Sequence, residues 1–286
     1  MPTKRSKDAA PPARSSLTPR TPRERNKHIE NKRNTSRNAA TLSYLEAGTG
    51  GRTALLIHGN YAGKSWWREL LADPPEDSRL LAPDMPGFGH SPAGKGFRPS
   101  MSRYARSLTD FLDDLGVERT ILVGHSFGGA VAVQMAIADP DRFPAMLLLS
   151  PAPLTGLHTP GFVYPLLESY RHDHRGLRRA LRRTMRTNVP PYLDDLVTEA
   201  RMTHPANFSG NARLLSDWSP NGESRLYTNP VLVASGNRDT LISPSSAKAT
   251  ARAFPAGSYL SLGNVGHSPQ IEAPDLVRKL LDGVLG

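Results

Sequence analysis

Val123-Gly-His-Ser-Phe-Gly-Gly129 is the stretch that decides the fold of this chain. It follows a short apolar run, residues 120–123, that is typical of a strand, and it precedes a second apolar run, residues 130–136, that fits a helix. A strand that turns directly into a helix brings neighbouring backbone so close that a Cβ would clash, and Gly124 and Gly128 carry none. The turn therefore exposes the hydroxyl of Ser126 at the carboxyl end of a strand, where open α/β sheets bind their ligands.

On both sides of this stretch, apolar runs with the pattern of strands alternate with helical patterns. The sequence predicts strands at residues 42–46, 54–57, 79–84, 119–123, 145–149, 230–235 and 258–262. It predicts one helix that begins near Lys64 and further helices at residues 100–115, 128–138, 245–253 and 273–285. Such alternation is typical of the α/β class, so we expect a mostly parallel central sheet with helices on both faces.

The alternation stops between residues 152 and 228, which are rich in Arg and Pro and have helical patterns without a strand. We therefore predict an α/β core at residues 41–151 and 229–286 and a helical insertion at residues 152–228. Within the insertion, Leu177, Leu181 and Met185 recur every four residues among arginines. This spacing predicts an amphipathic helix with a solvated basic face, and a cationic rim that attracts acidic substrates is the alternative.

The first 40 residues differ in composition from the rest of the chain. They hold 11 Lys or Arg and 3 Asp or Glu, which gives most of the formal net charge of +10. Their larger apolar side chains are Met1, Leu17 and Ile29, too few to bury a core, so we expect a disordered basic tail and no first strand before residue 41. Binding of nucleic acid or of an anionic surface through this tail is the alternative to a solvated tail.

Two further properties of the composition bear on where the protein acts. No run of about 18 apolar residues occurs, so the sequence predicts no transmembrane segment. Cysteine is absent, which excludes disulfides and thiolate chemistry and fits a reducing compartment. We therefore expect a cytoplasmic protein.

A serine hydroxyl is a weak nucleophile at neutral pH unless a base activates it. Downstream of Ser126, an acidic residue, Asp239, comes just after the predicted strand 230–235. A histidine, His267, follows in a glycine-flanked loop after the last short strand. The order Ser, Asp, His is expected after this kind of turn, and Asp84 and Asp217 are weaker candidates for the acid.

Together these motifs make the chain resemble the α/β-hydrolase fold family. Five stretches carry the resemblance: His58-Gly59-Asn60, Asp84-Met-Pro-Gly-Phe-Gly-His-Ser91, Gly124-His-Ser-Phe-Gly128, Ser235-Gly-Asn-Arg-Asp239 and Gly266-His267. The resemblance implies a triad of Ser126, His267 and Asp239. It also implies an oxyanion hole formed by the backbone N–H groups of Phe127 and Asn60, and an insertion that acts as a cap over the pocket. A site of this kind requires no cofactor and no metal.

Other residues are candidates for secondary roles. Tyr61, Trp66, Phe162 and Trp218 are candidate substrate-binding residues with apolar or aromatic side chains. We expect His58 and His125 to be structural. His172 and His174 are two residues apart on a predicted helix and face different ways, so we expect no metal site there.

The expected function is hydrolysis of a small or medium carboxylic ester or lactone through an acyl-enzyme. An aspartate at position 126 would have indicated an epoxide hydrolase or a haloalkane dehalogenase, but the residue is serine. A C–C bond hydrolase, a perhydrolase or haloperoxidase-like enzyme, and an acyltransferase remain alternatives with the same triad. A ligand-binding receptor on the same fold is an alternative of a different class.

Overall fold

The computed structural model describes residues 29–33 and 41–286 of the chain. Its central sheet has eight strands among these residues, in the order β1-β2-β4-β3-β5-β6-β7-β8. They are β1 (Glu30–Arg33), β2 (Ser43–Ala47), β3 (Arg52–Ile57), β4 (Ser78–Pro83), β5 (Ile121–His125), β6 (Met146–Leu149), β7 (Val231–Ser235) and β8 (Gly257–Ser261). The pairs β1–β2 and β2–β4 are antiparallel and the others are parallel, which confirms the predicted sheet.

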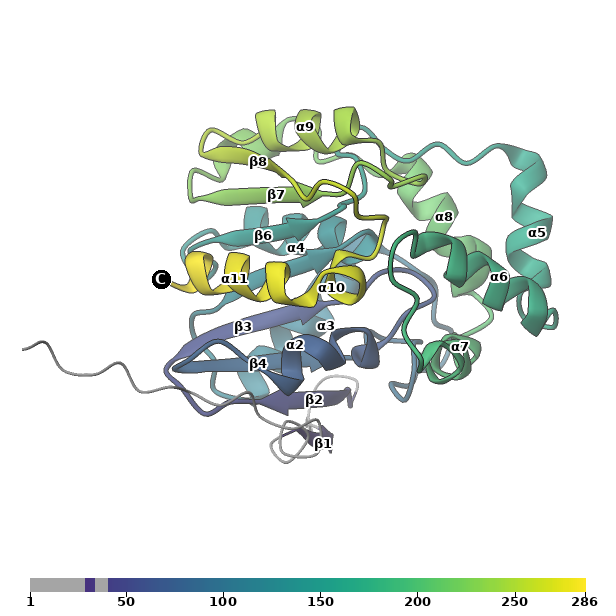
Figure 1. Ribbon diagram of the computed structural model, residues 1–286, viewed down its shortest axis with the longest axis horizontal. Helices are drawn as coiled ribbons and strands as arrows, with labels where there is room; N and C mark the ends of the chain where they lie inside the picture. The colour runs from purple at the N-terminus through teal and green to yellow at the C-terminus, as the bar shows by residue number, and fades with distance from the viewer. Residues whose placement is uncertain (1–28, 34–40) are drawn as a thin grey trace, which may run out of the picture.

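Helices cover both faces of the sheet, as the alternation predicts (Figure 1). Successive strand residues point to opposite faces, so Leu55 and Ile57 pack in one core cluster and Ala54 and Leu56 in the other. The first cluster includes residues of α3 (Met101–Asp114), α4 (Phe127–Ala138) and α9 (Pro244–Arg252). The second includes residues of the short helices η2 (Lys64–Trp67) and α2 (Arg68–Ala72), and of α11 (Pro274–Leu285), which α10 (Pro269–Glu272) precedes.

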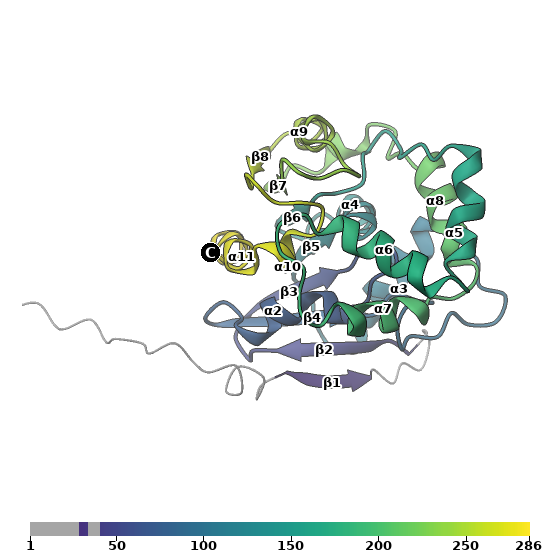
Figure 2. The same cartoon turned by 45° about the vertical axis from the view of Figure 1, so that its right-hand side comes forward.

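The segment between β6 and β7, which we call the insertion, contains helices and no strand in the part that the structure describes. These helices are η3 (Gly161–Val163), α5 (Tyr164–Ser169), α6 (His174–Thr184), α7 (Leu193–Arg201), α8 (Asn207–Asp217) and η4 (Glu223–Leu226). The insertion lies beyond the carboxyl ends of the parallel strands (Figures 1 and 2). On α6 the leucines at positions 177 and 181 are buried and the arginines are exposed, as the spacing predicts.

Strand β1 corrects the prediction that no strand precedes residue 41. It pairs with β2 at the edge of the sheet, where its side chains are mostly exposed, so it needs no apolar alternation. Lys32 Nζ lies 2.8 Å from a carboxylate oxygen of Glu46, and Arg79 Nε lies 2.7 Å from the other oxygen. A charged edge strand of four residues carries no hydrophobic signal, which is why the sequence conceals it. The prediction of disorder for the rest of residues 1–40 lies outside the described residues.

Helices long and apolar enough to cross a bilayer are absent from the described residues.

Candidate active site

The backbone at Ser126 is held in a conformation that few residues adopt. Its φ is 52° and its ψ is −117°, at the junction between β5 and α4. A Cβ on Gly128 would lie 2.3 Å from the carbonyl oxygen of Ile57, and a Cβ on Gly124 would lie 2.7 Å from the carbonyl oxygen of Gly128. Only glycine fits at these two positions, which confirms the predicted steric reason for the flanking glycines.

The loop after β3 passes directly beside Ser126. A Cβ on Gly59 would lie 3.3 Å from the Cβ of Ser126, so the two backbones are in close contact. Next to this contact, the backbone N–H groups of Asn60 and Phe127 donate to no acceptor among the residues that the structure describes. Two free N–H groups beside a serine at the N-terminus of a helix form an arrangement that can stabilise negative charge.

His58 fixes the start of this loop from inside the core. Its Nε2 accepts a hydrogen bond from the N–H of Met85 at 3.0 Å, so its Nδ1 carries the proton and donates to the carbonyl oxygen of Gly59 at 2.8 Å. Burial lowers the pKa of His58 to about 4. The neutral ring therefore has a structural role, in agreement with the expectation from sequence.

Asp239 and His267 form a hydrogen-bonded pair at the carboxyl ends of β7 and β8. The Nδ1 of His267 lies 2.8 Å from Oδ2 of Asp239, and both side chains are buried. Oδ1 of Asp239 accepts the N–H groups of Leu241 and Ile242 at 2.8 and 2.9 Å. Burial alone raises the pKa of Asp239, but the bonds from His267 and the two N–H groups outweigh it and leave the pKa below its usual value. The carboxylate thus stays ionised, and it directs the free Nε2 of His267 away from itself.

His125 connects the serine turn to the loop that carries His267. Its Nε2 donates to the carbonyl oxygen of His267 at 2.8 Å, and the two imidazole rings lie 5.0 Å apart between centroids. Burial is the main cause that lowers the pKa of His125 to about 3, and the electrostatic effect of the nearby His267 adds to it. This ring therefore stays neutral. Because His125 precedes Ser126 directly, this bond brings the serine turn and His267 to the same point of the sheet edge. The side chain of Ser126 is half-buried.

The four candidate substrate-binding residues do not gather in one place. Trp66 is buried and stacks on the ring of His125, with centroids 6.2 Å apart. Tyr61 packs against Tyr170 of the insertion and donates its hydroxyl hydrogen to the carbonyl oxygen of Phe208. Both lie where the core meets the insertion.

The other two candidates lie in different surroundings. Phe162 is 83% exposed, in the short helix η3 of the insertion. Trp218 is buried in the core cluster around α4, where its indole N–H donates to Oε1 of Gln134 at 3.3 Å. The sequence pattern showed their apolar character but could not show which way they point.

The two weaker candidates for the acid are engaged elsewhere or exposed. Asp84 is fully buried and forms an ion pair with Lys64, whose Nζ lies 2.6 Å from Oδ2 of Asp84. Asp217 is exposed at the end of α8. Asp239 is therefore the carboxylate that the fold brings to His267.

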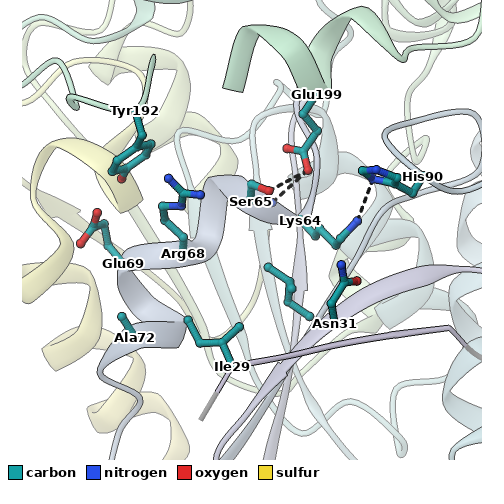
Figure 3. A pocket seen from close by; sticks show the side chains of 11 residues that line it. Ile29, Asn31, Lys64, Ser65, Arg68, Glu69, Ala72, His90, Tyr192 and Glu199 are labelled. Carbon is teal, nitrogen blue, oxygen red and sulfur yellow. Dashed lines mark hydrogen bonds between the residues drawn. The ribbon is translucent and has the colours of Figure 1, made fainter. Parts of the chain in front are cut away.

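Asp84 belongs to a buried polar cluster that sequence reasoning missed. Lys64 Nζ also lies 3.2 Å from Nδ1 of His90, and Ser65 Oγ donates to Oε1 of Glu199 at 2.8 Å (Figure 3). Glu199 comes from α7 of the insertion, whereas the other members come from the core. The cluster borders a cavity of about 600 Å³ lined by Ile29, Asn31, Leu45, Lys64, Ser65, Arg68, Glu69, Ala72, His90, Tyr192 and Glu199.

The two carboxyl groups of this cluster both lie against the side of Gly63 where a Cβ would stand. A Cβ on Gly63 would lie 2.6 Å from Oε2 of Glu199 and 2.8 Å from Oδ1 of Asp84. Burial and the charge of Asp84 together raise the pKa of Glu199 to about 7. Oε2 of Glu199 has no partner among the described residues, so this carboxyl group holds a proton more firmly than an ordinary glutamate does.

A second missed contact joins the insertion to the loop beside Ser126. Asn211 on α8 is buried and donates its Nδ2 hydrogen to Oδ1 of Asn60 at 3.0 Å. The hydroxyl of Tyr104 lies 3.0 Å from Oδ1 of Asn211 and 3.1 Å from Oδ1 of Asn207. No pattern in the sequence predicts these contacts, because the partners are more than 100 residues apart.

Groups of three or more side chains suited to hold a metal ion are absent from the residues described.

Comparisons with known proteins agree with this fold. The profile of a family described as alpha/beta hydrolase fold matches residues 55–274. The 2-hydroxymuconate semialdehyde hydrolase of Pseudomonas putida is 28% identical over 255 residues, which cover 82% of this chain and 87% of that protein. Haloalkane dehalogenase 2 of Mycobacterium tuberculosis is 25% identical, with 82% of this chain and 88% of that protein covered. A thermophilic esterase from Thermogutta terrifontis has the same fold, with a TM-score of 0.76, 22% identity, and 89% and 97% of the two chains covered.

Proposed function

Because this chain belongs to the α/β-hydrolase family, we propose that it is a serine hydrolase that cleaves a small or medium carboxylic ester or lactone. Ser126 is the proposed nucleophile, His267 the base and Asp239 the acid that orients it. The hydrogen bond of 2.8 Å between Asp239 and His267, beside the strained turn at Ser126, is the observation that carries the proposal. The proposed reaction needs no cofactor, and the proposed partner is a small molecule.

The proposed reaction follows from the hydrogen bond between His267 and Asp239. Nδ1 of His267 donates to Asp239, so the unprotonated Nε2 takes the proton of Ser126 as its hydroxyl oxygen attacks the substrate carbonyl carbon. The N–H groups of Phe127 and Asn60 stabilise the oxyanion, and the loss of one such donor typically costs about 3 kcal/mol. The imidazolium then protonates the leaving alcohol. A water molecule, deprotonated by His267, releases the acid from the acyl-enzyme.

The insertion lies over the carboxyl ends of the strands, and we propose that it acts as the cap of the pocket. Trp66 and Tyr61 are the proposed wall residues, since they lie where core and insertion meet. The absence of cysteine supports a proposed location in the cytoplasm.

The relatives favour one alternative reaction over another. The relative from Pseudomonas putida is named for the hydrolysis of 2-hydroxymuconate semialdehyde, a compound without an ester group. C–C bond hydrolysis by the same triad is therefore the second candidate function. Dehalogenation through a carboxylate nucleophile is disfavoured, because position 126 holds a serine hydroxyl.

A fluorophosphonate probe tests the nucleophile directly, because it reacts with activated serines. We expect the wild-type protein to be labelled, Ser126→Ala to be unlabelled, and the exposed Ser245→Ala on α9 to label like the wild type. Absence of labelling together with no turnover of short-chain nitrophenyl esters would exclude the hydrolase and favour a receptor. A panel of esters, lactones and vinylogous diketones, with product identification, then separates ester from C–C hydrolysis.

A further inference from the structure

Glu272, in the short helix α10, is held in an unusual set of hydrogen bonds. The residue is buried, and its Oε2 accepts four donors within 3.1 Å: the N–H of Arg186 at 2.8 Å, the N–H and the hydroxyl of Thr187 at 2.9 and 2.8 Å, and the N–H of Gly266 at 3.1 Å. Its Oε1 accepts the N–H of Ser268 at 3.2 Å. One carboxylate thus uses nearly all its acceptor capacity on neutral donors.

These donors belong to two separate segments of the chain. Gly266 and Ser268 are the residues immediately before and after His267, whereas Arg186 and Thr187 follow α6 in the insertion. The two segments are about 80 residues apart in sequence, and Glu272 binds both with the same side chain. A displacement of either segment therefore changes the bonds that hold the other.

The backbone of His267 itself completes the connection. Its N–H donates to the carbonyl oxygen of Thr184, at the end of α6, at 2.8 Å. The hydroxyl groups of Thr184 and Ser268 lie 3.1 Å apart. All three successive N–H groups at positions 266–268 are therefore bound either to Glu272 or to the insertion. This loop is not free to move without breaking several bonds at once.

The fit around Gly266 shows how tightly the segments pack. A Cβ at this position would lie 2.6 Å from Oε1 of Glu272, 2.8 Å from Cγ of Arg186 and 2.9 Å from the carbonyl oxygen of Thr184. Only glycine allows the loop to approach both the carboxylate and the insertion this closely.

We propose that Glu272 is a positioning residue, which sets the place of the His267 imidazole and couples it to the insertion. The inference rests on the proposed role of His267 as the base. Glu272 does not touch the reacting atoms. Its carboxylate accepts hydrogen bonds from the backbone N–H groups on both sides of His267. The oxygen that binds Gly266, Oε2, also accepts hydrogen bonds from the segment of the insertion that follows α6. A substrate that shifts this segment thereby changes the alignment of His267.

Two substitutions separate geometry from charge. In Glu272→Gln, the amide oxygen can take the place of Oε2, and the NH₂ group then faces the N–H of Ser268 and cannot accept it. The loop that carries His267 thus loses one of its two bonds to residue 272. In Glu272→Asp the charge remains, but the side chain is one methylene shorter and cannot reach both segments. If Glu272 acts by position, both variants lower kcat per fluorophosphonate-labelled site by about 10- to 100-fold, with KM changed less than kcat. If its charge were what mattered, Glu272→Asp would keep the wild-type kcat, which would overturn the proposal.

Controls and a milder variant protect this test against misfolding. Asp275→Asn, an exposed neighbour at the start of α11, is the matched control and should retain the wild-type kcat. Thr187→Val removes one donor from the insertion side without touching the histidine loop. We expect it to lower kcat by about 2- to 5-fold at an unchanged melting temperature, since the misplacement is smaller. If kcat were unchanged both in Thr187→Val and in a folded Glu272→Gln, Glu272 would contribute to the stability of the fold and not to the position of His267.

A spectroscopic measurement tests the same inference without turnover. The Nδ1–H proton of His267, bound to Asp239, should give a strongly downfield ¹H NMR resonance that is absent in His267→Ala. We expect this resonance to broaden or disappear in Glu272→Gln and to persist in Asp275→Asn. Persistence in Glu272→Gln would contradict the proposal. Because the signal does not depend on catalysis, it can be observed even if the fluorophosphonate fails to label Ser126.

Discussion

At the scale of single residues, the candidate active site depends on glycines at positions where no larger side chain fits. Ser126 adopts a positive φ that costs an L-residue about 1–3 kcal/mol and that persists only where the surroundings enforce it. Here the enforcing contacts are the backbone approaches at Gly124 and Gly128. The sequence showed these two glycines, because their spacing around a serine is a local pattern.

Gly59 is a third such position, and its replacement gives the first prediction at this scale. A Cβ there would lie 2.9 Å from Nδ1 of His125 and 3.3 Å from Cβ of Ser126, so the loop that carries Asn60 must move away. We expect Gly59→Ala to lower kcat/KM for a nitrophenyl ester by about 10- to 1000-fold, through loss of one oxyanion donor. Steady-state kinetics on the purified variant measures this change.

Gly51→Ala is the matched control for that experiment. Its Cβ would meet nothing within 4 Å, so activity should equal that of the wild type. An active Gly59→Ala would mean that the loop after β3 does not supply the oxyanion donor.

At the scale of elements, α8 holds the same loop from the other side. The bond from Asn211 to Oδ1 of Asn60 orients the Asn60 side chain, and Tyr104 on α3 completes the connection. Truncation of Asn211 removes the partner of Oδ1 of Asn60, whereas the hydroxyl of Tyr104 keeps Asn207. The loss of such a partner typically costs about 1–3 kcal/mol. We therefore expect Asn211→Ala to lower the melting temperature and to reduce kcat by about 3- to 10-fold.

Asp217→Asn, an exposed change on the same helix, should alter neither quantity. Thermal unfolding and ester turnover, measured on both variants, distinguish the effects. A kcat for Asn211→Ala equal to the wild-type value would show that α8 stabilises the fold without orienting the loop.

The elements themselves divide into those that the sequence reveals and those that it hides. Strands such as β3 and β5 are buried on both faces, so their continuous apolar runs identify them. β1 is hidden, because an edge strand of four residues draws its stability from backbone pairing and from ion pairs such as Lys32 with Glu46. The bounds of the predicted core strands differ from the observed ones by only one or two residues.

At the scale of the whole molecule, the core and the insertion meet through buried charges. Glu199 of α7 binds Ser65 of the core, with Lys64 and His90 beside it (Figure 3). Lys64 in turn pairs with the buried Asp84. In the folded protein the pKa of Glu199 is about 7, whereas its ordinary value is 4.5. Folding therefore takes up a proton between these two pH values, so this residue makes the protein less stable as the pH rises from about 4.5 through 7.

This sign gives a prediction for the variant Glu199→Gln, which cannot ionise. The free energy of unfolding of the wild type, minus that of the variant, should fall by on the order of 3 kcal/mol between pH 4.5 and pH 8. Urea denaturation at a series of pH values measures the difference. Glu69→Gln, on the other side of the same cavity, is the control. A difference independent of pH would mean that Glu199 is ionised throughout this range.

None of the contacts between core and insertion could be predicted from the sequence. Ser126, Asp239 and His267 stand out because each lies in a motif just after a strand. Glu199, Asn211 and Glu272 lie in ordinary helical patterns, and their partners come from distant parts of the chain. A sequence pattern reports neighbours along the chain, whereas these residues are defined by neighbours across the fold.

The position of the insertion between β6 and β7 has a consequence for how the protein is made. Ser126 leaves the ribosome before Asp239 and His267, because β6, the insertion and β7 lie between them in the chain. A nascent chain thus carries the proposed nucleophile without its proposed partners, and we expect it to remain inert towards acyl compounds until both partners have been made.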